Sequence, residues 1–152
     1  MVQDSLLEFG EKINEILPVV IQGFTRRQAN ALYKGQITLP QLFILDLLNR
    51  QGESKMTDMA HFMQVTTAAM TGIVERLVRD GYVVRVYDPE DRRIIKIKLT
   101  GKGNALVKKI NQQRLKMFIE IFGSISEVDR QDYLRILMQI RDVLARESST
   151  AK

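Results

Sequence analysis

Residues 57–100 carry two short helical patterns followed by two strand patterns, and this order constrains the fold more than any other feature of the chain. The helical patterns cover 57–63 and 66–80 and are separated by two residues. The strand patterns, rich in β-branched residues, cover 82–86 and 94–99. They are joined by the charged segment Tyr87-Asp88-Pro89-Glu90-Asp91-Arg92-Arg93. Two helices joined by a tight turn and followed by a charged β-hairpin are the layout of a winged helix-turn-helix, in which the second helix enters a DNA major groove and the wing reaches the flanking minor groove.

The composition is that of an ordinary globular chain and excludes several kinds of site. Its 152 residues suffice for one domain, or for one domain with an added dimerisation layer. Cysteine is absent, which excludes disulfides, thiolate metal sites and cysteine redox sensing, and with His61 as the only histidine we expect no metal and no cofactor. No apolar run approaches the roughly 20 residues of a membrane span and no signal-peptide pattern opens the chain, so we expect a cytoplasmic protein without a membrane partner.

The positive charge of the chain is concentrated around the predicted wing. Between Arg76 and Lys109 there are ten basic and four acidic residues, a net charge of +6, whereas the whole chain carries +5. The remainder therefore nets −1. A basic excess confined to one part of a fold is expected where phosphates must be neutralised, so the charge distribution favours a nucleic-acid partner.

Long helical patterns flank the predicted winged helix on both sides. Apolar residues recur at helical spacing over 4–32, with a kink predicted near Pro18, and again over 102–147. These segments are too long and too apolar to be absorbed by a winged helix core, and such stripes usually pair within a chain or across a two-fold axis. We therefore predict a mainly α fold with a small β-hairpin wing. It is a single domain over 1–152, with a DNA-binding part at 34–100 and N- and C-terminal dimerisation helices at 4–32 and 102–147.

Threonine and serine at cap positions predict where the helices begin. The predicted caps are Thr38, Thr57, Thr66 or Thr67, Thr100 and Ser126. Proline in the first turn supports the first of these caps, and Asp129 forms a capping box with the last. The helix after Thr38 is predicted to reach Asn49 and to be followed by a loop over 51–54, and the helix after Thr100 is predicted to end at Gly123.

The second helix of the motif divides into an apolar and a polar face. Four apolar residues recur at helical spacing and are predicted to face the core: Ala69, Ile73, Val74 and Leu77. The opposite face carries small, hydroxyl-bearing and charged residues, namely Thr66, Thr67, Ala68, Thr71, Gly72, Glu75, Arg76 and Arg79. Small residues allow close approach to base edges, and a threonine can donate to phosphate or base or place its methyl group against thymine. The alternative is a solvated amphipathic face with a threonine cap. The wing that follows in the sequence favours DNA binding over this alternative.

The wing carries a second set of candidate DNA contacts. Arg92 and Arg93 lie just past the Asp88-Pro89 turn, where long guanidinium side chains can enter a narrow minor groove. Asp91 is poorly placed as a phosphate contact because like charges repel, and we expect it to orient an arginine by a charge-assisted hydrogen bond. Two lysines on one strand face, and one before the third helix, are expected to reach phosphates or water: Lys96, Lys98 and, more weakly, Lys55. The alternative is a plain solvent-exposed hairpin.

The wing and three further segments carry a recognisable combination of residues. Residues 91–100, Asp91-Arg92-Arg93-Ile94-Ile95-Lys96-Ile97-Lys98-Leu99-Thr100, contain Asp-x-Arg followed by Leu-Thr, which resembles the wing signature of the MarR family of transcriptional regulators. Gly101-Lys102-Gly103, the recognition-helix segment 70–83 and the segment 39–45 are also similar to that family, in the expected order over essentially the whole chain. One residue departs from the pattern: Gly72 stands where many members have an arginine at the centre of the reading face, which puts one base or phosphate contact in doubt.

The resemblance implies a homodimer that binds pseudo-palindromic double-stranded DNA, usually as a repressor. It implies that Arg93 is the minor-groove arginine with Asp91 beside it, and that residues 66–76 read the major groove. Family members commonly release DNA when small anionic or phenolic compounds bind between the dimerisation and DNA-binding parts. Candidate pocket residues in this chain are Phe24, Tyr33, Phe43 and Phe62, whose alternative role is simple core packing.

Three other functions compete with a ligand-released repressor. A constitutive or purely autoregulated repressor needs no pocket at all. An enzyme finds no support, because the sequence has no Gly-rich phosphate loop, no nucleophile elbow and no metal cluster. A winged helix that binds protein instead of DNA has no need of paired arginines on its wing.

Overall fold

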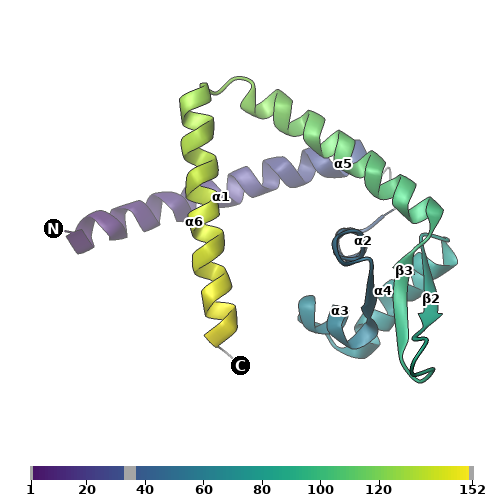
Figure 1. Cartoon of the computed structure of the whole chain (residues 1–152). Coiled ribbons are helices and arrows are strands. Elements are labelled where there is room, and N and C mark those ends of the chain that lie inside the picture. The colour runs from purple at the N-terminus through teal and green to yellow at the C-terminus, as the bar shows by residue number, and fades with distance from the viewer. Residues whose placement is uncertain (1, 33–36, 151–152) are drawn as a thin grey trace. The chain divides into compact units, whose positions relative to one another are not determined.

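The computed structural model describes residues 2–32 and 37–150 and places the side chains of 4–27 and 37–146. Its elements run in the order α1 (Val2–Leu32), α2 (Leu39–Gln51), β1 (Glu53–Lys55), α3 (Met56–Phe62), α4 (Thr67–Arg79), β2 (Val83–Tyr87), β3 (Ile95–Leu99), α5 (Gly101–Phe122) and α6 (Glu127–Thr150) (Figure 1). The described part of the chain is therefore mainly helical with one small antiparallel sheet, which confirms the predicted fold class.

The structure divides into two compact units, residues 1–113 and 114–152. The first unit contains α1 to α4, the sheet and the first part of α5, and the second contains the rest of α5 and α6. The first helix, α1, runs without interruption through Pro18. None of the described helices combines the length and the apolar content that crossing a membrane requires.

The sheet has three strands in the order β1-β3-β2, with β3 in the centre and antiparallel to both neighbours. The predicted hairpin is present, with Val83 opposite Leu99 and Tyr87 opposite Ile95. The prediction of a loop over 51–54 was wrong, because Glu53 pairs with Lys98 as the start of β1. This pairing joins residues far apart in sequence, and three residues carry too short a pattern to indicate a strand by themselves.

The core of the first unit is built where α2, α4 and the sheet meet the start of α5. Its fully buried side chains include Leu42, Leu45, Leu48, Met70, Val74, Leu77, Ile97, Val107 and Ile110. Placing Ala69 in the core was wrong, since Ala69 is exposed, Met70 is fully buried and Ile73 is half-buried. Burying the larger methionine removes more apolar surface from water than burying an alanine does, so α4 turns the face defined by Met70, Val74 and Leu77 inward.

Cap geometry confirms most of the predicted helix starts. The Thr38 and Thr66 side chains accept hydrogen bonds from the amides three residues later, and Thr38 forms a full capping box with Gln41. Thr57 is not a cap, because α3 begins at Met56 with Lys55 in the N-cap position and no side-chain cap. The strand β1 ends at Lys55, so the helix starts immediately after it and Thr57 falls inside the first turn.

The start of α5 is bound tightly to the turn after α4. The Thr100 hydroxyl accepts from the Gly103 amide at 3.0 Å, which makes it the predicted cap, and it donates to the Gly81 carbonyl at 2.7 Å. Lys102 donates to the Asp80 carbonyl at 2.7 Å and lies over the Tyr82 ring, 4.7 Å from the ring centroid. These contacts fix the base of the hairpin to the end of α4.

The second unit is organised around the turn between α5 and α6. Ser126 is the predicted cap, because its hydroxyl accepts from the Asp129 amide at 3.1 Å, and the same hydroxyl donates to the Asp129 carboxylate. Arg130 donates to the carbonyl oxygens of Phe122 and Ile125, so a guanidinium satisfies the last turn of α5. The Phe122 ring also lies against Tyr133, with ring centroids 5.4 Å apart.

Candidate nucleic-acid interface

The turn between α3 and α4 determines where α4, the predicted recognition helix, begins. Gln64 has a φ of 52°, in the left-handed region, and the following Val65 amide donates to the Ala60 carbonyl at 3.0 Å. Thr66 then caps α4, because its hydroxyl oxygen accepts from the Ala69 amide at 3.2 Å. Of the two threonines that the sequence offered as caps, the structure therefore uses the first.

The face of α4 that is turned away from the core carries the residues predicted to read bases. Thr67, Ala68, Gly72, Arg76 and Arg79 are exposed, and Thr71 is half-buried. The Thr71 hydroxyl donates to the Thr67 carbonyl at 2.8 Å, which leaves it an acceptor and a methyl group to present. The Thr66 hydroxyl accepts within the cap and keeps its own proton to donate. The two threonines thus offer complementary hydrogen-bonding roles at the start of the helix.

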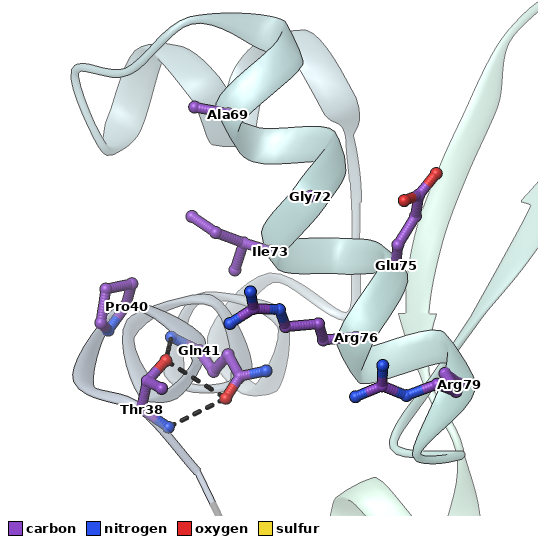
Figure 2. A pocket seen from close by; sticks show the side chains of 9 residues that line it. All are labelled: Thr38, Pro40, Gln41, Ala69, Gly72, Ile73, Glu75, Arg76 and Arg79. Atoms are coloured by element: carbon purple, nitrogen blue, oxygen red, sulfur yellow. Dashed lines mark hydrogen bonds between the residues drawn. The ribbon is translucent and has the colours of Figure 1, made fainter.

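A groove of about 840 Å³ runs between the start of α2 and this face of α4. Its lining consists of Thr38, Pro40, Gln41, Ala69, Gly72, Ile73, Glu75, Arg76 and Arg79 (Figure 2). The Thr38 amide donates to the buried Gln41 side-chain oxygen at 2.9 Å, so one wall of the groove is held by the capping box of α2. Sequence reasoning identified the cap at Thr38 but missed Pro40 and Gln41 as neighbours of the reading face, since only packing brings α2 beside α4.

The charged residues of α4 differ in their ion pairs. Arg79 pairs with Asp80 at 3.2 Å, and Glu75 lies 3.9 Å from Arg85 of β2. Within the described part of the chain, no acidic side chain lies within ion-pairing distance of Arg76, which extends toward the start of α2 in Figure 2. Arg76 thus has no carboxylate partner among the described residues and extends toward the N-terminus of α2 (Figure 2), where the helix dipole is positive. Both features favour the binding of an anion in this groove.

The tip of the wing, residues 88–94, is a hydrogen-bonded turn. One carboxylate oxygen of Asp88 accepts from the amides of Glu90 and Asp91 at 3.0 and 3.3 Å. The Asp91 carboxylate accepts from the Arg93 backbone amide at 2.9 Å. Asp91 therefore contacts the predicted minor-groove arginine through its backbone, and the exposed guanidinium of Arg93 projects from a fixed point of the chain.

Lys96 is held between two carboxylates. Its ammonium lies 2.8 Å from the second oxygen of Asp88 and 2.9 Å from the carboxylate of Glu53 in β1. The hydrogen bond from Lys96, followed by those from the Glu90 and Asp91 amides, lowers the pKa of Asp88 from 3.8 to about 2. The hydrogen bonds to Asp88 and Glu53 raise the pKa of Lys96. Lys98, two positions along the same strand, is exposed.

The remaining predicted site residues lie on several different elements. Lys55 is exposed at the junction of β1 and α3. Of the predicted pocket aromatics, Phe43 on α2 and Phe62 on α3 are about half exposed, Phe24 on α1 is partly buried, and Tyr33 lies outside the described residues. None of the three described rings lines the groove beside α4. In the part of the chain that is described, no three His, Cys, Asp or Glu side chains are grouped so as to hold a metal ion.

Comparison with known sequences places the chain among DNA-binding regulators. The model of the MarR family matches residues 37–95, which span the start of α2 to the start of β3. The HTH-type transcriptional regulator FarR of Neisseria gonorrhoeae is 31% identical over 116 residues, covering 74% of this chain and 80% of FarR. The HTH-type transcriptional repressor MdtR of Bacillus subtilis is 25% identical over 111 residues, covering 73% and 72% of the two chains.

Solved structures share the fold. A MarR family protein from Bacillus stearothermophilus superposes with a TM-score of 0.83 at 21% identity, over 91% of this chain and 96% of that one. A mutant of MarR from Escherichia coli, solved with operator DNA, superposes with a TM-score of 0.68 at 22% identity, over 85% and 93% of the two chains. At these identities the structural likeness establishes the fold.

Proposed function

This chain belongs to the MarR family of transcriptional regulators, and on that premise we propose that it is a homodimeric repressor that binds a pseudo-palindromic operator in double-stranded DNA and is released by a small-molecule effector. A regulator of this kind works in the compartment that holds the DNA, so we also propose a cytoplasmic location. MdtR, which is named a repressor, supports the repressor assignment.

The observation that carries the proposal is the pairing of an exposed reading face with a basic wing in one unit. α4 presents small and hydroxyl-bearing residues over its first two turns, where a helix must approach base edges closely. The wing presents Arg92 and Arg93, both exposed, from a turn fixed by Asp88 and Asp91. Arginines suit a narrow minor groove because its negative potential attracts them.

Exposed apolar side chains on the terminal helices support the homodimer. Large apolar residues of α1 are 41–68% exposed, among them Leu6, Phe9, Ile13, Ile16, Val20 and Ile21. Those of α6 are 41–72% exposed and include Val128, Leu134, Leu137, Ile140 and Leu144. Contiguous apolar stripes of this length mark interaction surfaces. We therefore assign the dimer interface to 4–32 and 102–147 and the DNA-binding part to 34–100.

A two-fold axis predicts the form of the operator. Two reading helices related by such an axis bind half-sites about one helical turn apart, roughly 34–36 Å centre to centre. The operator should therefore be an inverted repeat with that spacing. We retain as DNA contacts Thr66, Thr67, Ala68, Thr71, Gly72, Arg76 and Arg79 on α4, with Asp91, Arg92 and Arg93 on the wing and Lys55 beside α3. Lys96, a further predicted contact, is paired with Glu53 and Asp88.

The effector site is proposed at the aromatic residues Phe24, Phe43 and Phe62, with Tyr33 as a further candidate. Half-exposed rings on α2 and α3 offer apolar surface that a phenolic or anionic aromatic compound could cover. A constitutive repressor is the competing hypothesis. It predicts that no compound shifts the operator affinity once an operator is known.

The test of DNA binding is a fluorescence anisotropy titration of the protein against the DNA upstream of its own gene, in about 150 mM salt with excess random competitor. Specific, competitor-resistant binding supports the proposal and supplies an operator for effector screening. Binding that random DNA removes equally well would leave a basic winged helix whose target lies elsewhere. Absence of binding to either DNA would favour a protein partner.

The wing assignment is tested by Arg93→Ala. Loss of a specifying arginine is expected to cost about 1–3 kcal/mol, or roughly 5- to 150-fold in affinity, at each half-site of the operator. Arg50→Ala is the matched control, because Arg50 is an exposed arginine in the last turn of α2 and is not among the predicted DNA contacts. Equal affinities for the wild type and Arg93→Ala would remove the wing from the interface.

A further inference from the structure

We propose that Lys96 is a positioning residue that clamps the wing to the sheet, in place of the phosphate contact that its sequence position suggests. The inference rests on the proposed DNA-binding function. Its starting observation is that one ammonium joins three separate segments: Lys96 in β3, Asp88 at the start of the wing tip, and Glu53 in β1.

The clamp is continuous with the turn that presents the arginines. Lys96 lies 2.8 Å from one oxygen of Asp88, while the other oxygen of Asp88 accepts from the amides of Glu90 and Asp91. The Asp91 carboxylate in turn accepts from the Arg93 amide at 2.9 Å. A chain of hydrogen bonds therefore leads from Lys96 to the backbone from which the Arg93 side chain projects.

The edge of the sheet is fixed by the same group. Glu53, whose carboxylate lies 2.9 Å from Lys96, belongs to β1, and β1 leads directly into α3. The lysine thus links the wing tip to the strand that precedes the helix-turn-helix. Hydrogen bonds between ionised partners are shorter and stronger than neutral ones, so this link restrains the wing more than a single neutral bond would.

The surroundings of Lys96 disfavour a phosphate contact. Two carboxylates within 3 Å of one ammonium leave a local net charge of −1, which repels a phosphate. The Lys96 side chain is only 22% exposed. Lys98 lies on the same strand, is exposed, and within the described residues lies in no ion pair, so it remains the better phosphate contact of the two. The lowered pKa of Asp88 and the raised pKa of Lys96 keep these two groups ionised throughout the physiological pH range.

The experiment compares Lys96→Met with Lys98→Met as a matched pair, since both remove one positive charge from β3. Operator affinity is measured by anisotropy over a series of salt concentrations. Each phosphate contact that is lost reduces the slope of log affinity against log salt by about 0.9, so Lys98→Met, which removes one contact from each protomer of the dimer, is expected to reduce it by about 1.8. For Lys96→Met we expect an affinity loss on the order of tenfold with an unchanged slope.

Two further variants distinguish positioning from general destabilisation. If Lys96 acts by positioning Arg93, Lys96→Met should cause little further loss of operator affinity in an Arg93→Ala background. If the two residues made independent contacts, the two losses of binding free energy would add. Lys96→Arg should restore affinity, because a guanidinium can bridge the same two carboxylates. A Lys96→Met variant with full operator affinity, or one with a slope reduced by about 1.8 for the dimer and a loss fully additive with Arg93→Ala, would overturn the proposal.

Hydrogen exchange separates failure of this inference from failure of the proposed function. The Glu90 and Asp91 amides donate to Asp88, so Lys96→Met should increase their exchange rates in the free protein while the amides of α4 stay protected. Unchanged exchange at these two amides would exclude the clamp whatever the DNA result. If the wild type binds no DNA while the two amides lose protection in the variant, the clamp exists and the proposed function fails.

Discussion

Replacing Gly103 with alanine is expected to destabilise the first unit strongly, because α5 begins in direct contact with the backbone of the preceding turn. A Cβ at position 103 would lie 2.0 Å from the Tyr82 carbonyl oxygen, 3.0 Å from the carbonyl carbon and 3.2 Å from a methyl carbon of Leu99. The same oxygen accepts hydrogen bonds from the Thr100 amide at 3.1 Å and from the Thr100 hydroxyl at 3.2 Å. The Tyr82 carbonyl group therefore cannot move far enough away to admit the methyl group without stretching these hydrogen bonds.

The magnitude follows from two costs and one opposing gain. Inserting a methyl group into a rigid contact costs about 1–3 kcal/mol, and weakening the Thr100 bonds adds about 1 kcal/mol. Replacing glycine in a helix recovers about 0.5–1 kcal/mol. The net loss is therefore about 1–3.5 kcal/mol of unfolding free energy, which corresponds to a fall in Tm of about 2–14 °C for a chain of this size.

The control is Gly101→Ala, in the same first turn of α5. A Cβ at position 101 meets nothing within 4 Å, so this substitution carries the same entropic gain without the steric cost. Both variants are compared with the wild type by thermal and urea unfolding at one protein concentration, because dimerisation would make Tm concentration-dependent. Gly101→Ala should match or exceed the wild type. Equal unfolding free energies for the two variants would refute the close approach of α5 to Tyr82.

Two further predictions address the reading helix and the wing. Thr66→Ala removes the α4 cap and should lower the unfolding free energy by about 1 kcal/mol. Thr67→Ala leaves the cap in place and should lower it less. Equal losses for the two variants in urea unfolding would count against the cap at Thr66. Because the folded pKa of Asp88 is lowered from 3.8 to about 2, the stability that its contacts supply is fully present above pH 4 and is lost as the pH falls toward 2. An NMR titration of the Asp88 carboxyl group should give a midpoint near 2 in the folded protein, and a midpoint at the ordinary value would contradict the ion pair with Lys96.

Much of the fold follows from short-range patterns in the sequence. The caps at Thr38, Thr66, Thr100 and Ser126 are local interactions between a side chain and an amide three residues away, so sequence spacing indicates them. Spacing nevertheless left Thr66 and Thr67 as alternatives and wrongly added Thr57. The hairpin follows from two β-branched runs around a Pro-containing charged turn. The exposed arginines of the wing also follow, since charged side chains at a turn have little choice but to face solvent.

Other features depend on contacts between distant segments, and the sequence left them undetermined. β1 exists because Glu53 pairs with Lys98, and the inward face of α4 includes Met70 because α2 and the sheet leave room for it. The groove beside α4 required Gln41 to be brought next to Arg76.

Lys96 shows the difference most clearly. Its alternation with Ile95 and Ile97 correctly placed it on the more polar face of a strand, which is a local property. The same alternation cannot identify its ion-pair partners, because Glu53 lies 43 residues earlier in the chain. Side-chain alternation determined by itself that a positive charge would stand on this face of the wing. Only the tertiary structure decided whether that charge is free for DNA or neutralised by carboxylates, because ion pairing depends on distances that the fold alone sets.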